Sequence, residues 1–163
     1  MGGPWTYESG HSFNATGTDR AVLDELFSAV CAGIVGRRMY DVVDGWGEEQ
    51  ALPFPIFVVT SRPADKRVVG KSSYTVVTDG IQSALRQARA AAGDKGVSIG
   101  GGARVIQRYL AAGVVDDMQV HLAPVLLGKG TRLFDDLGSP PPRITPIDVR
   151  WSEDATHVRY QVG

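Results

Sequence analysis

Apolar residues recur along this chain with two periods, one typical of helices and one typical of strands. In residues 19–30 they fall every three or four positions, which predicts a helix with Thr18 as its cap. The same period predicts a helix over residues 79–92, capped by its first residue, aspartate, and another that ends at Gly113. Residues 37–43 are expected to form a short helix.

Two runs rich in β-branched residues, 55–60 and 74–78, predict buried strands. Further strands are predicted over residues 32–36, 97–99 and 117–124. Alternating apolar positions in 147–151 and 158–162, on either side of the polar residues 152–154, predict an antiparallel hairpin. Residues 1–17 show no clear period, and we interpret them as a loop.

Strands that alternate with helices and end in a hairpin predict an α/β fold. We expect a mainly parallel twisted sheet with flanking helices on both faces, an antiparallel edge and a C-terminal antiparallel hairpin. A chain of 163 residues with 43% hydrophobic and 21% charged residues suits one globular domain over residues 1–163.

Charge and cysteine content exclude several classes of protein. The net charge of −1 gives no electrostatic reason to expect nucleic acid or an anionic membrane as a partner. A single cysteine, Cys31, excludes a disulfide framework and a multi-cysteine metal site. With neither a membrane-spanning run nor a signal-peptide pattern in the sequence, we expect a cytoplasmic protein.

A run of glycines between a predicted strand and a predicted helix is the first candidate binding site. The run is Gly100, Gly101 and Gly102, followed by Ala103 and Arg104. Glycine lets a ligand approach the main chain, and the first amides of a helix attract anions such as a pyrophosphate. The dinucleotide-binding pattern Gly-x-Gly-x-x-Gly does not fit, because valine stands at the third glycine position. A simple tight turn is the alternative.

Two further predicted strands end in residues that suit a phosphate group. These residues are Gly36, Arg37 and Arg38 after one strand and Thr60, Ser61 and Arg62 after another. Ligands collect at the carboxyl ends of parallel strands, and the planar guanidinium group of arginine binds phosphate through two hydrogen bonds. The alternatives are a solvated basic turn at the first position and an ordinary turn before a proline at the second.

These motifs together resemble the dihydrofolate reductase superfamily, in the branch related to the reductase domain of riboflavin biosynthesis. The resemblance covers roughly residues 19–163. It rests on four segments, residues 34–40, 58–63, 98–103 and 122–134. It implies the dihydrofolate reductase-like fold and an NADPH-dependent reductase. By analogy, the small-molecule substrate is pterin-like or pyrimidine-ribityl-like, and the protein forms a homodimer.

The resemblance also implies a role for each loop. Residues 36–38 match the turn that meets the cofactor phosphates. Residues 60–62 match the loop that meets the adenosine 2′-phosphate, which favours NADPH over NADH. Residues 100–104 match the loop under the pyrophosphate and the nicotinamide.

The first strand of the family, which ends in a Leu-Asp-Gly-like motif, is not matched in residues 1–17. We therefore expect a single domain that lacks this strand, either as a truncated form or with an incomplete site. A non-catalytic protein that binds NADP(H) or another nucleotide is the alternative function. A binder of flavin or of another phosphate ligand is a third possibility.

Hydride transfer to a C=N or C=O bond also requires a proton source. In dihydrofolate reductases a carboxylate on the helix before the Gly-Arg turn assists, which makes Asp19 the catalytic candidate ahead of Asp24 and Glu25. His11 is a candidate for substrate contact. The histidines, at positions 11, 121 and 157, show no metal-ligand spacing, so no metal is expected.

Overall fold

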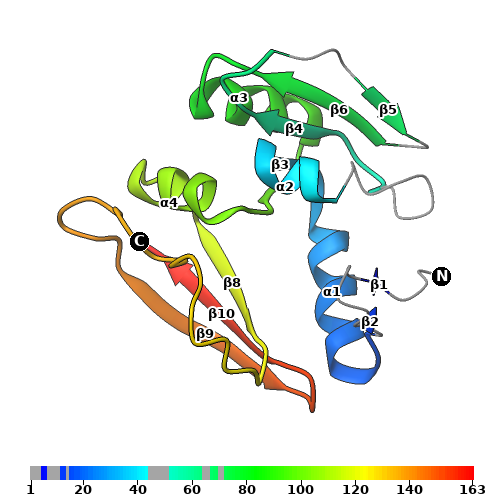
Figure 1. The fold of residues 1–163 in the computed structure, drawn as a ribbon, viewed down its shortest axis with the longest axis vertical. Coiled ribbons are helices and arrows are strands. Elements are labelled where there is room, and N and C mark those ends of the chain that lie inside the picture. Colours follow the sequence, from blue (N-terminus) through cyan, green and yellow to red (C-terminus); the bar gives the residue numbers. More distant parts are fainter. Residues whose placement is uncertain (1–4, 7–11, 14, 44–51, 64–66, 70–71) are drawn as a thin grey trace. The chain divides into compact units, whose positions relative to one another are not determined.

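Apolar strands pair side by side in the computed structural model of this chain (Figure 1). They are β3 (Val30–Gly36), β4 (Ile56–Val59), β6 (Ser72–Val77) and β7 (Gly96–Ile99). These strands pair in parallel, and β5 (Arg67–Val69) pairs antiparallel with β6, in the order β5-β6-β4-β3-β7. The structure describes residues 5–6, 12–13, 15–43, 52–63, 67–69 and 72–163.

The chain divides into two compact units, which are described separately. The parallel-sheet unit consists of Ser28–Val115 and Lys129–Pro142. The hairpin unit consists of Met1–Phe27, Asp116–Gly128 and Arg143–Gly163. Because the chain divides in this way, the single domain expected over residues 1–163 stays a prediction.

Helices cover both faces of the parallel sheet, because alternate side chains of a strand point to opposite faces. The helices of this unit are α2 (Arg37–Val42), α3 (Ile81–Ala92) and α4 (Ala103–Ala111). Ala32 and Ile34 of β3 pack with Phe57 of β4 in the core formed with α3 and α4. On the other face, the ring of Tyr40 in α2 lies 5.4 Å from the ring of Tyr74 in β6.

Hydrogen bonds of two buried side chains hold α4 in place. The Tyr109 hydroxyl donates to the Ile81 carbonyl at 2.7 Å, and burial raises the pKa of Tyr109 to about 12, so the donor proton is retained at neutral pH. Gln107 Nε2 donates to the carbonyl oxygens of Arg132 at 3.0 Å and Leu133 at 3.2 Å. These bonds position the glycine loop that leads into α4.

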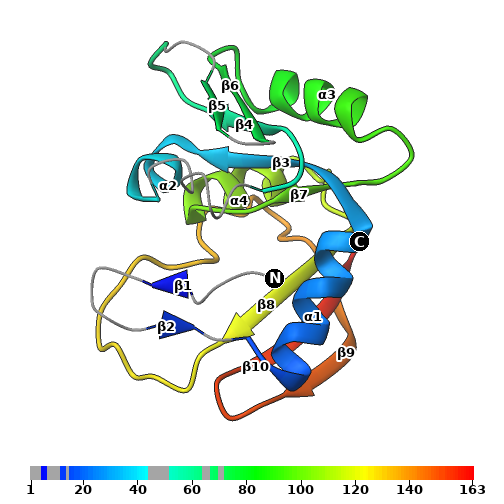
Figure 2. The same ribbon diagram turned by 90° about the vertical axis from the view of Figure 1, so that its right-hand side faces the viewer.

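The hairpin unit contains an antiparallel sheet in the order β8-β10-β9 (Figure 2). Its elements are α1 (Gly17–Ala29), β8 (Asp117–Leu122), β9 (Ile144–Trp151) and β10 (Thr156–Val162). The predicted hairpin is β9 and β10, and the Ser152 amide donates to the Ala155 carbonyl at 2.9 Å to close its turn. The register places His157 directly opposite His121 of β8.

The α/β fold class is confirmed, but several local predictions were wrong. The antiparallel edge of the parallel sheet is β5, which was not predicted, and the hairpin belongs to the three-stranded sheet. The predicted N-terminal loop contains a short antiparallel pair, β1 (Trp5–Thr6) and β2 (Ser12–Phe13). Strands of two residues are too short to show a period.

Two predicted helix caps were also wrong. Helix α1 begins at Gly17, so Thr18 lies inside its first turn. Helix α3 is capped by Gly80 with φ of +100°, and no side chain caps it, so Asp79 is not the cap. Glycine adopts this backbone conformation without steric cost, and the chain therefore turns into the helix one residue later than predicted.

Candidate functional site

The predicted phosphate loops all follow strands that end at the same edge of the parallel sheet. In the parallel register, Gly36 of β3 pairs with Val59 of β4, and Ile34 pairs with Ile99 of β7. The carboxyl ends of these strands therefore lie side by side. The structure brings together at this edge the residues predicted from the sequence to bind the cofactor, namely Gly36, Arg37, Arg38, Thr60, Ser61, Arg62, Gly100, Gly101, Gly102, Ala103 and Arg104.

Two of these loops touch through their backbones. The Gly36 amide donates to the Gly101 carbonyl at 2.8 Å, and the Gly100 amide donates to the Ile34 carbonyl at 2.9 Å. A Cβ atom at Gly36 would lie 2.9 Å from Val105 Cγ2, closer than carbon atoms normally approach. The close packing of the Val105 side chain explains why glycine stands at position 36.

The glycine loop ends at the beginning of α4. The first hydrogen bond of the helix is donated by the Val105 amide to the Gly102 carbonyl at 3.0 Å. The amides of Ala103 and Arg104 precede it and have no acceptor one helical turn earlier. Together with the partial positive charge at the start of α4, they fit a phosphate or pyrophosphate group. The residues present at this edge therefore fit the phosphate groups of the dinucleotide that the resemblance implies.

A carboxylate that was not predicted from the sequence links the turn after β3 to the loop after β4. Asp41 of α2 accepts a hydrogen bond from Arg37 Nε at 2.7 Å, and it forms an ion pair with Arg62 Nη2 at 3.6 Å. The Arg62 amide donates to Thr60 Oγ1 at 3.0 Å, which closes the loop after β4. The spacing of four residues between Arg37 and Asp41 was the available signal.

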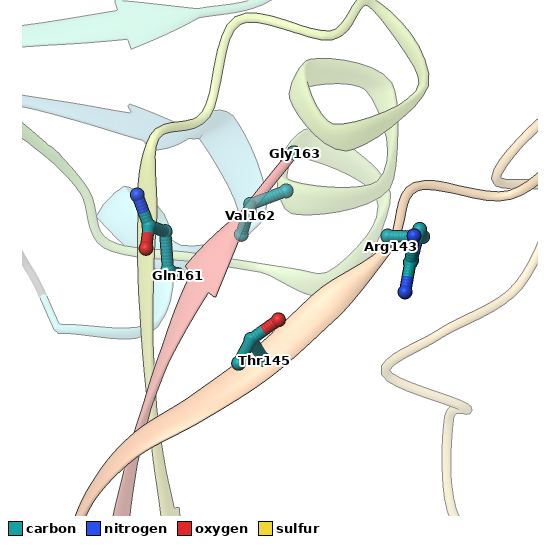
Figure 3. Close-up of a pocket in the computed structure, with 5 residues that line it drawn as sticks. All are labelled: Arg143, Thr145, Gln161, Val162 and Gly163. Atoms are coloured by element: carbon teal, nitrogen blue, oxygen red, sulfur yellow. The ribbon is translucent and has the colours of Figure 1, made fainter.

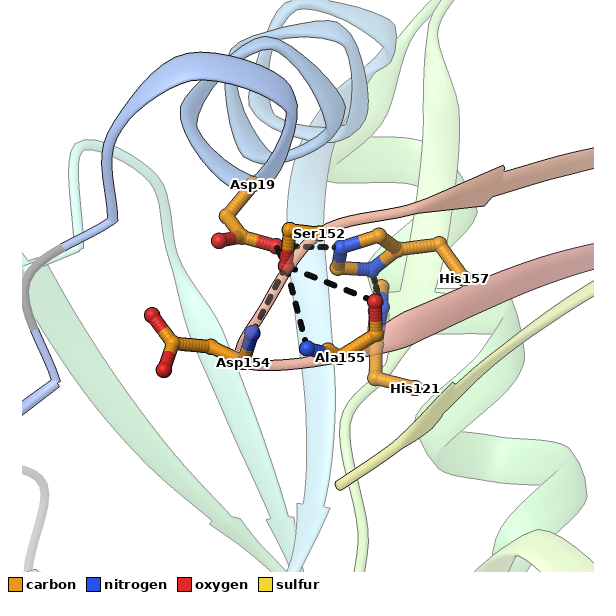
Figure 4. Close-up of polar contacts among 6 residues, drawn as sticks. All are labelled: Asp19, His121, Ser152, Asp154, Ala155 and His157. Atoms are coloured by element: carbon orange, nitrogen blue, oxygen red, sulfur yellow. Dashed lines mark hydrogen bonds and ion pairs between the residues drawn. The ribbon is translucent and has the colours of Figure 1, made fainter. Parts of the chain in front are cut away.

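Asp19, the predicted catalytic residue, lies in the hairpin unit within a buried polar cluster (Figure 4). Its side chain is 3% exposed, and its Oδ1 lies 2.6 Å from His157 Nε2. Ser152 Oγ donates to the same oxygen at 2.8 Å. On the other side of the His157 ring, Nδ1 lies 2.6 Å from His121 Nδ1. Asp19, His157 and His121 therefore form a continuous hydrogen-bonded chain, the acid–base cluster.

Asp19 differs from the other two carboxylates that were considered as the proton source, because it belongs to this cluster. Asp24 is 59% exposed in an ion pair with Arg20, and Glu25 is 60% exposed in an ion pair with Arg150. Such exposed pairs contribute little to stability and are typical of a helix surface. In the cluster, two facing Nδ1 atoms form a hydrogen bond only if one of them carries the proton. The cluster is thus able to hold a proton and pass it along.

The pH dependence of stability gives a test of the cluster. Burial lowers the pKa of His121 below 6.5, and His157 lowers it further, while the Asp19 carboxylate raises it. With a lower pKa in the folded state, the unfolded state binds more protons just below pH 6.5, so stability falls as the pH drops through this range. We expect a smaller fall in His121→Asn, measured by urea unfolding at about pH 7.5 and about pH 5.5. An equal fall in both proteins would contradict this assignment.

Three further features concern a substrate contact, a metal site and a membrane-spanning helix. His11, the predicted substrate contact, lies outside the described residues. Among the described residues, no group of three His, Cys, Asp or Glu side chains is placed to hold a metal ion. Within the same ranges, the helices are all too short or too polar to cross a membrane.

An open hollow of about 320 Å³ lies at one end of β9 and β10 (Figure 3). Its lining residues are Arg143, Thr145, Gln161, Val162 and Gly163. Backbone hydrogen bonds between Arg143 and Gly163 pair the two strands beside it. The lining includes none of the predicted cofactor residues and no member of the acid–base cluster, so we assign it no catalytic role.

Comparisons with known proteins agree with the fold and with the sequence motifs. The family model described as the RibD C-terminal domain matches residues 3–158. No curated protein matches the chain by sequence. A structure assigned to riboflavin biosynthesis from Shewanella sp. PV-4 is 22% identical, with a TM-score of 0.74 over 96% of this chain and 85% of that one.

Two further solved structures share the fold at lower identity. A pyrimidine reductase-like protein from Corynebacterium diphtheriae is 16% identical, with a TM-score of 0.62 over 96% of this chain and 88% of that one. The diaminohydroxyphosphoribosylaminopyrimidine deaminase/5-amino-6-(5-phosphoribosylamino)uracil reductase from Thermotoga maritima is 17% identical, with a TM-score of 0.65. That match covers 99% of this chain and 53% of the Thermotoga protein.

Proposed function

This chain belongs to the RibD C-terminal domain family, and from that premise we propose that it is an NADPH-dependent reductase. Its substrate is a small heterocyclic or sugar-derived compound, of the pyrimidine-ribityl or pterin class. The names of the fold relatives, which include a pyrimidine reductase-like protein and a 5-amino-6-(5-phosphoribosylamino)uracil reductase, favour the pyrimidine class. The reaction is the transfer of a hydride to a C=N or C=O bond.

One observation carries the cofactor part of the proposal, the contact between two glycine loops at the edge of the parallel sheet. The bond from the Gly36 amide to the Gly101 carbonyl holds the turn after β3 and the glycine loop side by side at this edge. We assign the cofactor phosphates to the Gly36 turn and to the amides at the start of α4, and the adenosine 2′-phosphate to Ser61 and Arg62. Arginine suits a phosphate monoester because its planar group donates two parallel hydrogen bonds.

We assign the supply of the proton that the reaction requires to the acid–base cluster of the hairpin unit. NADPH, when bound, supplies the hydride, and the chain must supply a proton to the nitrogen or oxygen of the reduced bond. Asp19 is our catalytic candidate, and it acts through His157 and His121, because its own carboxylate is buried behind them. The cluster holds the proton and keeps the rings oriented.

A cytoplasmic homodimer is part of the same proposal. Val149 and Trp151 lie on one face of β9 and are 59% and 77% exposed, and Ile147, beside a register shift in the same strand, is 50% exposed. Exposed apolar side chains gathered on one surface are typical of protein–protein contacts. Sedimentation that returned only the 17.4 kDa monomer would exclude the dimer.

Calorimetric titration with NADPH and with NADH tests the proposal. We expect NADPH to bind at least about tenfold more tightly, a difference of about 1.4 kcal/mol. Oxidation of NADPH in the presence of pyrimidine-ribityl and pterin compounds then tests turnover. Binding without turnover on any of these substrates would favour the alternative, a non-catalytic nucleotide-binding protein. If neither dinucleotide bound, the proposal would fail.

A further inference from the structure

Asp41 links the two arginine-bearing loops at the edge of the parallel sheet. One of its carboxylate oxygens, Oδ1, accepts from Arg37 Nε at 2.7 Å, and the other, Oδ2, lies 3.6 Å from Arg62 Nη2. Arg37 is the first residue of α2, directly after β3, and Arg62 lies in the loop after β4. The carboxylate therefore sits between two guanidinium groups, each of which contacts a different oxygen.

Two arginines that bind a single bridging anion adopt the same arrangement. A phosphate monoester has the oxygens to replace both carboxylate contacts, and it binds guanidinium groups more strongly because it carries more charge. The side chains of Arg62 and Asp41 are 70% and 43% exposed, so a ligand can reach the pair from solvent. Asp41 thus competes with any phosphate that approaches Arg37 and Arg62.

We propose that Asp41 weakens the discrimination of this chain between NADPH and NADH. The inference rests on the proposed function, which assigns the adenosine 2′-phosphate to the loop containing Arg62. The 2′-phosphate of NADPH meets a like charge at Asp41 and must share the guanidinium groups with it. NADH carries a neutral 2′-hydroxyl instead, which a carboxylate accepts as a hydrogen-bond donor.

The same carboxylate also orients the arginines. Removal of its charge therefore has two opposing effects on phosphate binding: the arginines are held less firmly, and the phosphate is no longer repelled. The ion pair of Arg37 with Asp41 is a partly exposed pair four residues apart in a helix, and such pairs are weak. The contact with Arg62 is longer and more exposed. The repulsion between a carboxylate and a doubly charged phosphate a few ångströms apart is the larger effect. Removal of the charge therefore strengthens phosphate binding.

Calorimetric titration of the wild type and Asp41→Asn with NADPH, NADH and adenosine 2′,5′-bisphosphate tests the inference. In Asp41→Asn we expect the preference for NADPH over NADH to rise by about fivefold to tenfold, with NADH affinity nearly constant. The affinity for adenosine 2′,5′-bisphosphate, which lacks the nicotinamide, rises with that for NADPH. Asp41→Glu keeps the charge and the wild-type preference.

Asp24→Asn is the matched control. Asp24 accepts from Arg20 Nε at 2.8 Å, also four residues apart in a helix, but it lies in the hairpin unit. This variant keeps the wild-type preference. An unchanged or reduced preference for NADPH in Asp41→Asn, with wild-type binding intact, would overturn the inference alone. If the wild type and Asp41→Asn bound none of the three ligands, both the inference and the proposed function would fall.

Discussion

Gly101→Ala is expected to weaken NADPH binding by at least about tenfold, which corresponds to about 1.4 kcal/mol. Gly101 has φ of +110°, a conformation that a residue with a Cβ atom adopts only under strain, at a cost of about 1–3 kcal/mol. The added Cβ would also lie 2.8 Å from Met39 Sδ. Since the Gly101 carbonyl accepts from the Gly36 amide, the strain displaces both cofactor loops together.

The next residue of the same loop provides the control. Gly102 has φ of −73°, and a Cβ atom there would have no atom within 4 Å. Gly102→Ala is therefore expected to bind NADPH nearly as the wild type does. Calorimetric titration measures both affinities, and urea unfolding measures the strain independently of any ligand. Wild-type stability and binding in Gly101→Ala would show that the glycine loop tolerates a side chain and is an ordinary turn.

Asp19→Ala is expected to lower the free energy of unfolding by about 2–4 kcal/mol, because it leaves buried polar groups without their acceptor. The Asp19 side chain is 3% exposed and that of His157 is 5% exposed. Asp19 accepts from both His157 and Ser152, so its removal breaks two bonds that join α1 to the hairpin. Urea unfolding monitored by circular dichroism measures the loss.

A conservative variant, Asp19→Asn, distinguishes the contribution of Asp19 to stability from its proposed role in proton transfer. Asp19→Asn keeps an acceptor oxygen but removes the carboxylate charge, so it retains more stability than Asp19→Ala. If Asp19 handles the proton, Asp19→Asn still binds NADPH while its turnover falls and the pH profile of turnover shifts. Asp24→Asn, on the exposed side of α1, leaves stability and turnover unchanged. Full turnover with an unshifted pH profile in Asp19→Asn would leave Asp19 a purely structural role.

The loops proposed to bind phosphate could be located from the sequence because their motifs are local. A strand followed by glycine, or by hydroxyl and arginine residues, is visible over six or seven positions of the sequence. Parallel pairing then places the ends of neighbouring strands at the same edge, so the juxtaposition of Gly36, Thr60 and Gly100 follows from the fold class. The short strands β1, β2 and β5 could not be found in this way, since they have too few residues to show a period.

The acid–base cluster could not be predicted from local sequence patterns. Asp19 could be chosen as a candidate from its place before the Gly-Arg turn, but nothing in the sequence pairs it with His157, 138 residues away. His121 falls within a predicted strand and His157 lies just before another, and the sequence shows no partner for either. Only the antiparallel register between β8 and β10 brings their rings together, and a shift of one residue would turn His157 to the other face of the sheet.

By itself, the sequence determined the longer helices and strands and the positions at which glycine permits a close approach to the main chain. These properties depend on the period of the apolar residues and on the steric freedom of single positions, both of which act over a few residues. The tertiary structure alone decided that Asp41 joins Arg37 to Arg62 and that Asp19, His157 and His121 share one chain of hydrogen bonds. Those contacts depend on strand register and helix packing, which bring His157 within 2.6 Å of both Asp19 and His121 and bring Arg62 within 3.6 Å of Asp41.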